Sequence, residues 1–167
     1  APALVVAGPG LDTPYGQRLH QLAASLPQAA NIFFPGMLTG AAKWGAFYGC
    51  EAFVLPSHQE NFGIAVVEAL ACGKPVLISN QVNIWREIEA AQGGLVAADT
   101  LAGTKHLLES WYQLAEPARQ AMRERAQAGY RQYFAVAPAS QKLLKVLSHK
   151  VFLPSTVLFR PYCSRPE

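Results

Sequence analysis

The chain has 167 residues, of which 51% are hydrophobic and 15% are charged, and its formal net charge at pH 7 is +3. This length suits one folded core, and the composition is too apolar for a disordered chain. No apolar stretch approaches the roughly 18 residues of a membrane span, and the basic residues are scattered, so we expect neither a transmembrane helix nor a nucleic-acid partner.

The cysteines and the first residues bear on the cellular compartment. Cys50, Cys72 and Cys163 are isolated, odd in number and without metal-type spacing, so neither a disulfide framework nor a zinc site is expected. No charged start followed by an apolar core is visible after Ala1 and Pro2, so the sequence shows no secretory signal. The cytoplasm is the expected location.

Strands and helices alternate along the chain. Strands are predicted where short apolar runs end at turn residues, at 3–7, 31–34, 52–55, 75–78 and 94–97. Helices are predicted by longer periodic segments, at 14–26, 39–49, 62–72, 82–91, 102–115, 117–134 and 139–149. This alternation indicates an α/β fold with a Rossmann-like parallel sheet and helices on both faces, in which a ligand binds at the carboxyl ends of the strands.

Two further segments complete the predicted organisation. Residues 1–150 are assigned to one partial domain, whereas 151–167, with three prolines and no clear period, are assigned to a C-terminal tail. Gly8-Pro9-Gly10 is interpreted as a turn from strand to helix, because the third glycine and the downstream acid of a dinucleotide loop are not in place. An NAD-type Rossmann domain remains a weaker alternative.

The segment from 52 to 72 carries most of the functional argument. Residues 52–55 form an apolar run that ends at Pro56, and Asn61 is a favourable N-cap for a helix over 62–72. The amides around Phe62, Gly63 and Ile64 would then have no partner within the helix, and the helix dipole adds partial positive charge there. A phosphate could approach the backbone at Gly63, which has no side chain.

Two carboxylates flank this predicted helix start. Glu60 lies in the preceding loop, whereas Glu68 is seven residues past Asn61, or about 10 Å along a helix at roughly 1.5 Å per residue. They are too far apart to share one metal ion, but each suits the hydroxyls of a sugar, one at the transferred sugar and one at a ribose. Without further information, the residues fit equally well an alternative in which Glu68 is a solvated helix residue and Glu60 is a turn residue.

A known family has the same pattern. Pro-Ser-x-x-Glu-Asn-Phe-Gly at 56–63, followed after four residues by Glu-Ala-Leu-Ala-x-Gly-x-Pro-Val at 68–76, resembles the Glu-x7-Glu signature of glycosyltransferase family 4. That family consists of retaining enzymes with a two-domain GT-B fold. Weaker matches lie at 3–10, 32–36 and 93–96, and the resemblance extends from about Ala3 to about Leu147.

The resemblance implies that 1–150 are a nucleotide-sugar-binding domain, the C-terminal half of a GT-B enzyme. It makes Glu60 the catalytic residue, near the hydroxyls of the transferred sugar. The donor-binding residues that it implies are His58, Asn61, Phe62, Gly63, Ile64 and Glu68, with Met37 and Leu38 along the base and Lys43 near a phosphate or the base. Without it, Lys43 and His58 are also interpretable as an exposed helix lysine and a solvated loop histidine.

The implied reaction transfers a sugar from a nucleoside-diphosphate sugar to an acceptor hydroxyl with retention, and it uses no cofactor. No metal is expected, because Asp12 and Asp99 are the only aspartates and cannot form an Asp-x-Asp motif. The family's N-terminal acceptor domain, and the basic pair ending in Lys-Gly, do not occur in this sequence. We therefore expect a fragment without turnover by itself, and peripheral membrane association through the absent domain stays open. The alternative is a non-catalytic nucleotide-binding or regulatory module of the same fold.

Overall fold

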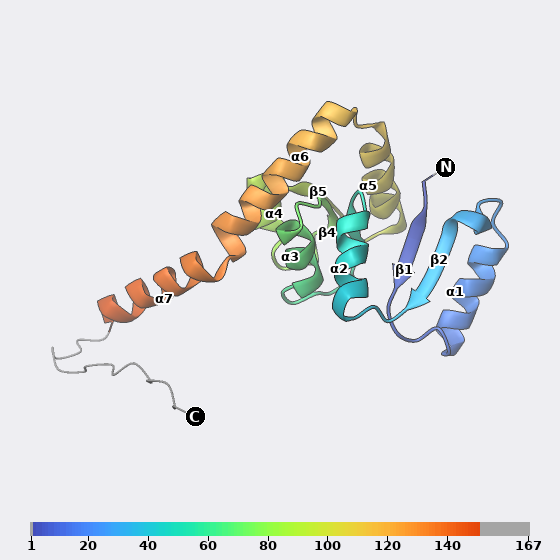
Figure 1. Cartoon of the computed structure of the whole chain (residues 1–167), viewed down its shortest axis with the longest axis horizontal. Helices are drawn as coiled ribbons and strands as arrows, with labels where there is room; N and C mark the ends of the chain where they lie inside the picture. The colour runs from blue at the N-terminus through green and yellow to red at the C-terminus, as the bar shows by residue number, and fades with distance from the viewer. Residues whose placement is uncertain (1, 151–167) are drawn as a thin grey trace, which may run out of the picture. The chain divides into compact units, whose positions relative to one another are not determined.

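The computed structural model describes residues 2–150, and its elements are labelled in Figure 1. The predicted tail at 151–167 lies outside the described residues. The chain divides into two compact units, Ala1–Cys50 and Glu51–Glu167, and each unit is described by itself below. The assignment of 1–150 to one domain stays a prediction.

The first unit is a βαβα segment with two parallel strands. Its elements are β1 (Leu4–Ala7), α1 (Pro14–Ala24), a 3-10 turn (Ala29–Asn31), β2 (Ile32–Gly36) and α2 (Gly40–Gly49). Leu4 pairs with Ile32 and Val5 with Phe33, and the register shifts before Ala7. The residues between β1 and α1 form a turn, as the sequence predicts for Gly8-Pro9-Gly10.

Packing explains the glycine in the first turn of α1. Thr13 caps this helix, because its hydroxyl accepts a hydrogen bond from the amide of Gly16 at 3.1 Å. A Cβ at Gly16 would lie 2.1 Å from the carbonyl oxygen of Gly10, closer than any side chain tolerates. The turn after β1 therefore folds directly onto the helix backbone.

The second unit contains a three-stranded parallel sheet in the order β3-β4-β5. The strands are β3 (Phe53–Leu55), β4 (Val76–Ser79) and β5 (Gly94–Ala97). The helices of this unit are α3 (Ile64–Ala71), α4 (Trp85–Ala91), α5 (Leu101–Gln113), α6 (Glu116–Gly129) and α7 (Val136–Lys150), with a π-helical turn at Tyr130–Phe134. The central strand β4 is fully buried, as expected of a parallel strand covered on both sides.

Helices cover both faces of this sheet. α3 packs on β3 and β4, α4 packs on β4 and β5, and both helices contact α6. α5 packs on β4 and β5, with Leu107 and Trp111 in one buried cluster with Leu77. Because side chains alternate along a strand, Leu77 points to the face opposite that of Val76 and Ile78. The predicted α/β class, with parallel strands and helices on both faces, is confirmed.

The helix predicted over 117–134 differs from the structure at its end. α6 stops at Gly129, and the chain continues as a π-helical turn in which the amide of Ala135 donates to the carbonyl of Tyr130 at 2.9 Å. This wider turn accompanies an edge-to-face contact between Phe134 and Phe62, whose ring centroids are 6.2 Å apart. The predicted uninterrupted helix is therefore wrong over its last turn.

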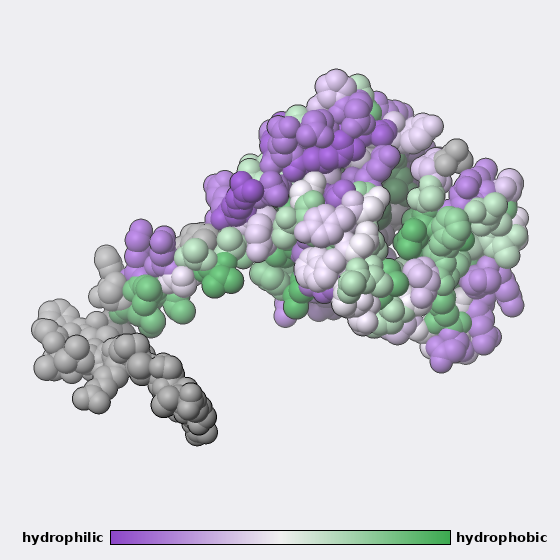
Figure 2. Space-filling model, in the orientation of Figure 1, coloured by the Kyte–Doolittle hydropathy of each residue, from purple (hydrophilic) through white to green (hydrophobic). Residues whose placement is uncertain are grey.

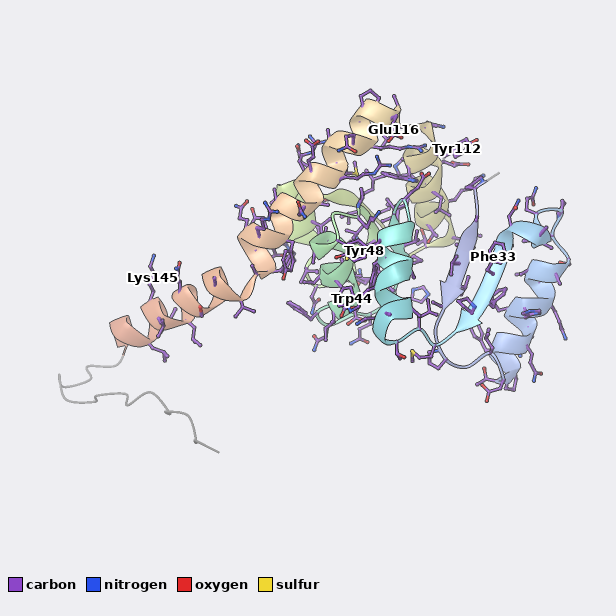
Figure 3. The ribbon with its side chains drawn as sticks, in the orientation of Figure 1. Phe33, Trp44, Tyr48, Tyr112, Glu116 and Lys145 are labelled. Atoms are coloured by element: carbon purple, nitrogen blue, oxygen red, sulfur yellow. The ribbon has the colours of Figure 1, made fainter. Side chains whose placement is uncertain are left out.

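The outer surfaces of the last two helices differ in polarity. Figure 2 shows mainly hydrophilic residues over α6, whereas the described part of α7 presents hydrophobic as well as hydrophilic residues, with Leu143, Leu144 and Leu147 exposed. Glu116, which Figure 3 labels, is the first residue of α6, and its carboxylate accepts a hydrogen bond from Nη1 of Arg123 at 2.6 Å. This hydrogen bond, together with the positive charges of Arg123 and Arg119, holds the pKa of the Glu116 carboxyl below its usual value.

Candidate functional site

The carboxyl ends of β3, β4 and β5 lie at one edge of the parallel sheet, and the candidate site is built from the loops that follow them. The loop after β3 pairs with the loop after β4. The amide of Glu60 donates to the carbonyl of Gln81 at 3.2 Å, and the amide of Asn83 donates to the carbonyl of Glu60 at 3.0 Å. These two bonds form an isolated parallel bridge between Glu60 and Val82, which fixes the backbone of Glu60 at this edge.

A buried hydroxyl holds the same loop closer to the sheet. Ser79, the last residue of β4, has no exposed surface, and its hydroxyl donates to the carbonyl of Ser57. The Ser79 oxygen also accepts a hydrogen bond from the amide of Gln81 at 3.3 Å. A buried hydroxyl is stable only with such partners, so Ser79 ties the loops after β3 and β4 together.

The start of α3 differs from the sequence-based expectation. The N-cap is Gly63, with φ 70° and ψ 58°, and the helix begins at Ile64, so the predicted cap at Asn61 is wrong. The Asn61 side chain instead accepts a hydrogen bond from Nδ2 of Asn83 at 3.3 Å. Asn61 therefore links the loops after β3 and β4, while the left-handed conformation that the chain needs falls on a glycine.

Gly63 is enclosed as well as left-handed. A Cβ there would lie 3.1 Å from Val66 Cγ2 and 3.3 Å from Val82 Cγ1. Its amide donates to Oε1 of Glu60 at 3.1 Å. Backbone conformation and packing thus account for the glycine, and its amide already has the Glu60 carboxylate as partner. Whether Gly63 also contacts a diphosphate stays a prediction.

The next amides are better placed for a ligand. Ile64 and Ala65 are the first two residues of α3, so their amides have no acceptor within the helix. Ile64 is 68% exposed, and Phe62 is half-exposed with its ring edge-on to Phe134. This end of the helix carries the positive end of the dipole, which favours an anion.

Glu68 lies one turn after Ile64. Residues four apart share a helix face, so Glu68 is on the face of Ile64, opposite the buried Val66, Ala69 and Leu70. It is half-buried, and it lies about 7.5 Å along the helix axis from Gly63 at roughly 1.5 Å per residue. Because the cap is Gly63 and not Asn61, Glu68 lies five residues past the cap instead of the expected seven.

His58 has a partner that the sequence analysis did not identify. Its Nδ1 lies 3.0 Å from Oδ2 of Asp99, with side-chain exposures of 84% for His58 and 32% for Asp99. Asp99 follows β5 and is 41 positions away in sequence. Asp99 could have been identified from the sequence, because it comes just after a predicted strand and therefore lies at the carboxyl edge of the sheet.

The predicted base-binding residues belong to the first unit. Met37 is 61% exposed and Leu38 is half-buried, and both lie between β2 and α2. Nζ of Lys43 lies 4.7 Å from the ring centroid of Trp44, which Figure 3 labels on α2. The grouping of Met37, Leu38 and Lys43 with Glu60 in one site stays a prediction.

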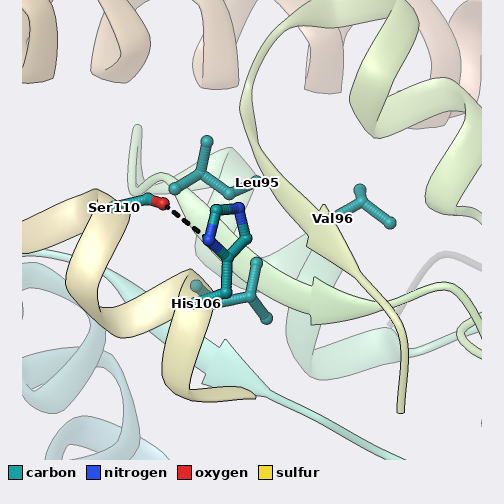
Figure 4. Close-up of a pocket in the computed structure, with 5 residues that line it drawn as sticks. Leu95, Val96, His106 and Ser110 are labelled. Carbon is teal, nitrogen blue, oxygen red and sulfur yellow. Dashed lines mark hydrogen bonds between the residues drawn. The ribbon is translucent and has the colours of Figure 1, made fainter. Parts of the chain in front are cut away.

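Two cavities lie elsewhere in the second unit. One of about 70 Å³ lies between β5 and α5, where Ser110 and Nδ1 of His106 are 3.5 Å apart (Figure 4). The other, of about 380 Å³, is lined by Glu89, Gln92, Gly94, Leu95, Val96, Met122 and Arg125. It begins at Gly94, at the opposite end of β5 from Asp99.

The described residues hold neither a metal-type cluster nor a membrane-spanning helix. Residues 2–150 contain no group of three or more His, Cys, Asp or Glu side chains arranged to hold a metal ion. None of the helices that the structure describes has the length and hydropathy needed to cross a bilayer. Neither Cys50 nor Cys72 takes part in a disulfide, and Cys163 lies outside the described residues.

Comparison with known proteins identifies the family. The family model described as glycosyl transferases group 1 matches residues 2–129. The chain belongs to this family, and its α/β fold is that of GT-B glycosyltransferases.

One curated relative and two solved structures illustrate the likeness. The chain is 37% identical over 98 residues to the D-inositol 3-phosphate glycosyltransferase of Stackebrandtia nassauensis, covering 57% of this chain and 19% of that protein. Anabaena Alr3699/HepE, solved in complex with UDP and glucose, superposes with a TM-score of 0.70 at 22% identity, over 87% of this chain and 40% of that one.

The second structure is a C-terminal domain. It comes from a glycosyl transferase group 1 family protein (LpcC) of Francisella tularensis, and it superposes with a TM-score of 0.65 at 16% identity, over 75% of this chain and 65% of that one. The chain thus covers most of a domain of this kind but only about a fifth of the length of the curated relative.

Proposed function

We propose that this chain is the donor-binding part of a retaining glycosyltransferase of family 4, which transfers a sugar from a nucleoside-diphosphate sugar to an acceptor hydroxyl. The main support is the position of Glu60. Its backbone is fixed by the loop after β4, and its carboxylate lies at the start of α3, at the carboxyl edge of a parallel sheet. The match of the group 1 family model to residues 2–129 adds to this support.

In this proposal the diphosphate lies at the start of α3. The amides of Ile64 and Ala65 donate to its oxygens, beside the backbone of Asn61, Phe62 and Gly63. As the bond to the transferred sugar breaks, negative charge accumulates on the departing diphosphate, and these amides with the helix dipole stabilise it. A metal ion and a resident cofactor have no part in this proposal.

The carboxylates bind the two sugars of the donor. Glu60 is the catalytic residue because it contacts the hydroxyls of the transferred sugar, and Glu68 accepts hydrogen bonds from the ribose diol. Met37 and Leu38 line the base through main-chain groups, with Lys43 near a phosphate or the base. Because main-chain groups are alike in all residues, these contacts do not indicate which base is bound.

The remaining parts of the proposal concern the whole protein. The acceptor site belongs to a second domain, so the chain 1–167 by itself binds donor without turning it over, consistent with its covering 19% of a curated relative. We place the protein in the cytoplasm, where thiols such as those of Cys50 and Cys72 remain reduced.

Calorimetric titration of the chain with UDP, GDP and ADP tests the proposal. At least one diphosphate should bind, and Glu68→Gln should weaken it about tenfold or more, because a hydrogen bond to a charged group contributes about 1.5–3 kcal/mol. The control Glu124→Gln alters an exposed carboxylate on α6 and should leave binding unchanged.

Four outcomes would contradict all or part of this proposal. Failure of all three diphosphates to bind the folded chain would refute it, and so would binding of NADH in their place. Equal effects of the Glu68 and Glu124 substitutions would remove Glu68 from the site. Binding by a full-length protein that never glycosylates an acceptor would favour the regulatory module.

A further inference from the structure

The pair of His58 and Asp99 bridges the loops after β3 and β5. Because the strand order is β3-β4-β5, the pair spans the carboxyl end of the central strand. Nδ1 of His58 and Oδ2 of Asp99 are 3.0 Å apart. The pair therefore lies at the same edge of the sheet as Glu60, which follows His58 by two residues.

Both ends of this bridge are anchored by other contacts. Next to His58, the carbonyl of Ser57 accepts from the buried Ser79 hydroxyl. Next to Asp99, Thr100 caps α5, and its hydroxyl accepts from the amide of Gly103 at 3.0 Å. The loops are held without the ion pair, and exposed ion pairs add little to stability, so structure alone does not account for the pair.

The hydrogen-bonding chemistry of the pair is directional. An ionised carboxylate only accepts hydrogen bonds, so the proton shared with Asp99 sits on Nδ1 of His58. In the neutral ring, Nε2 then has the free lone pair and accepts a hydrogen bond. With 84% of the His58 side chain exposed, that nitrogen is open to a ligand.

We propose that Asp99 is a positioning residue that orients His58 so that Nε2 accepts a hydrogen bond from a hydroxyl of the transferred sugar. This inference rests on the proposed donor site. His58 and Glu60 then present two acceptors from one fixed loop, which suits adjacent hydroxyls of a hexose. Asp99 itself contacts no ligand and acts only through the His58 ring.

Binding measurements at pH 8, where free imidazole is neutral, test this assignment. The probes are UDP, GDP and ADP, each compared with its hexose conjugate, UDP-glucose, GDP-mannose or ADP-glucose. His58→Ala and Asp99→Ala should each weaken the sugar conjugate about fivefold while leaving the free diphosphate unchanged. The double variant should be no weaker than His58→Ala, since Asp99 acts through the ring.

A spectroscopic readout separates positioning from a structural role. Long-range proton–nitrogen NMR of the His58 ring should show the Nδ1–H tautomer in the free chain and a shift toward Nε2–H in Asp99→Ala. Asp99→Asn, which keeps an oxygen acceptor, should restore part of both the tautomer and the affinity. The matched controls are His106→Ala and Glu109→Ala on α5, an exposed imidazole and an exposed carboxylate, which should change neither.

The outcomes distinguish this inference from the donor site itself. If the diphosphates bind but Asp99→Ala changes neither the tautomer nor the affinity for the conjugate, the positioning role is refuted and the donor site stands. Equal weakening of diphosphate and conjugate would assign His58 to the phosphates and overturn the sugar contact. If no probe binds the folded chain, the donor site fails, and this inference fails with it.

Discussion

Replacing Gly63 by alanine should destabilise the second unit more than the same change at another left-handed glycine. Gly63 has φ 70° and Gly73, which follows α3, has φ 69°, so both substitutions place an alanine in the left-handed region. That conformation costs roughly 1–2 kcal/mol, partly offset by the smaller entropy of the unfolded alanine chain. Conformation alone therefore predicts a loss of about 1 kcal/mol at each site.

Packing distinguishes the two positions. An added Cβ at Gly73 finds its nearest neighbours at 3.9 Å, which is ordinary contact. At Gly63 the neighbours are Val66 at 3.1 Å and Val82 at 3.3 Å, and both valines are fully buried. Overpacking of this kind costs about 1–3 kcal/mol more, so Gly63→Ala should lose about 2–4 kcal/mol in total.

Denaturant unfolding of the two variants and the parent chain, followed by circular dichroism, measures this difference. Both glycines lie in the unit Glu51–Glu167, so unfolding of the first unit affects the two variants alike. A loss at Gly63 equal to or smaller than the loss at Gly73 would refute the packing argument. A loss of about 1 kcal/mol at both sites would leave only the backbone conformation as the reason for the glycine.

Two further predictions concern a buried hydroxyl and a surface ion pair. Ser79→Ala removes the donor to the Ser57 carbonyl and should cost about 1–3 kcal/mol of stability, measured by denaturant unfolding; an unchanged midpoint would mean that the loop is held without it. Because the Arg123 hydrogen bond lowers the pKa of Glu116 from 4.5, its contribution to stability is present above pH 4.5 and is lost as the pH falls through the lowered pKa. The difference in melting temperature between the parent chain and Glu116→Gln should therefore shrink in acid, and a difference that grows there would contradict the assignment.

The sequence predicted the order and type of the elements because the apolar periodicity is strong. The buried run Val76–Ser79, for example, lies within one residue of the strand predicted at 75–78. The start of α3 was misplaced for a physical reason. Local preference favours Asn61 as a cap, but the Asn61 side chain bonds to Asn83 in the loop after β4, and the cap falls on Gly63. A local sequence pattern contains no information about that tertiary contact.

The candidate site was predictable in its residue types but not in its connections. The sequence spacing predicted that Glu60 precedes a helix start and that Glu68 lies within the helix, and the structure has this arrangement. The bond from the Gly63 amide to Glu60 depends on a side-chain rotamer, and the bond from His58 to Asp99 depends on strand order. Neither hydrogen bond can therefore be predicted from the spacing of residues along the sequence.

The contacts around Glu60 suggest why the loop after β3 suits a binding role. Its anchors come from outside the loop, from Ser79 at the end of β4 and from Gln81 and Asn83 after β4, and Asp99 after β5 contacts its His58 side chain. A loop held in this way is already ordered before a ligand arrives, so less of the binding free energy is lost to ordering it. The segment with the recognisable motif therefore does not form the site by itself. Substitutions in the two neighbouring loops should change ligand affinity without touching either glutamate.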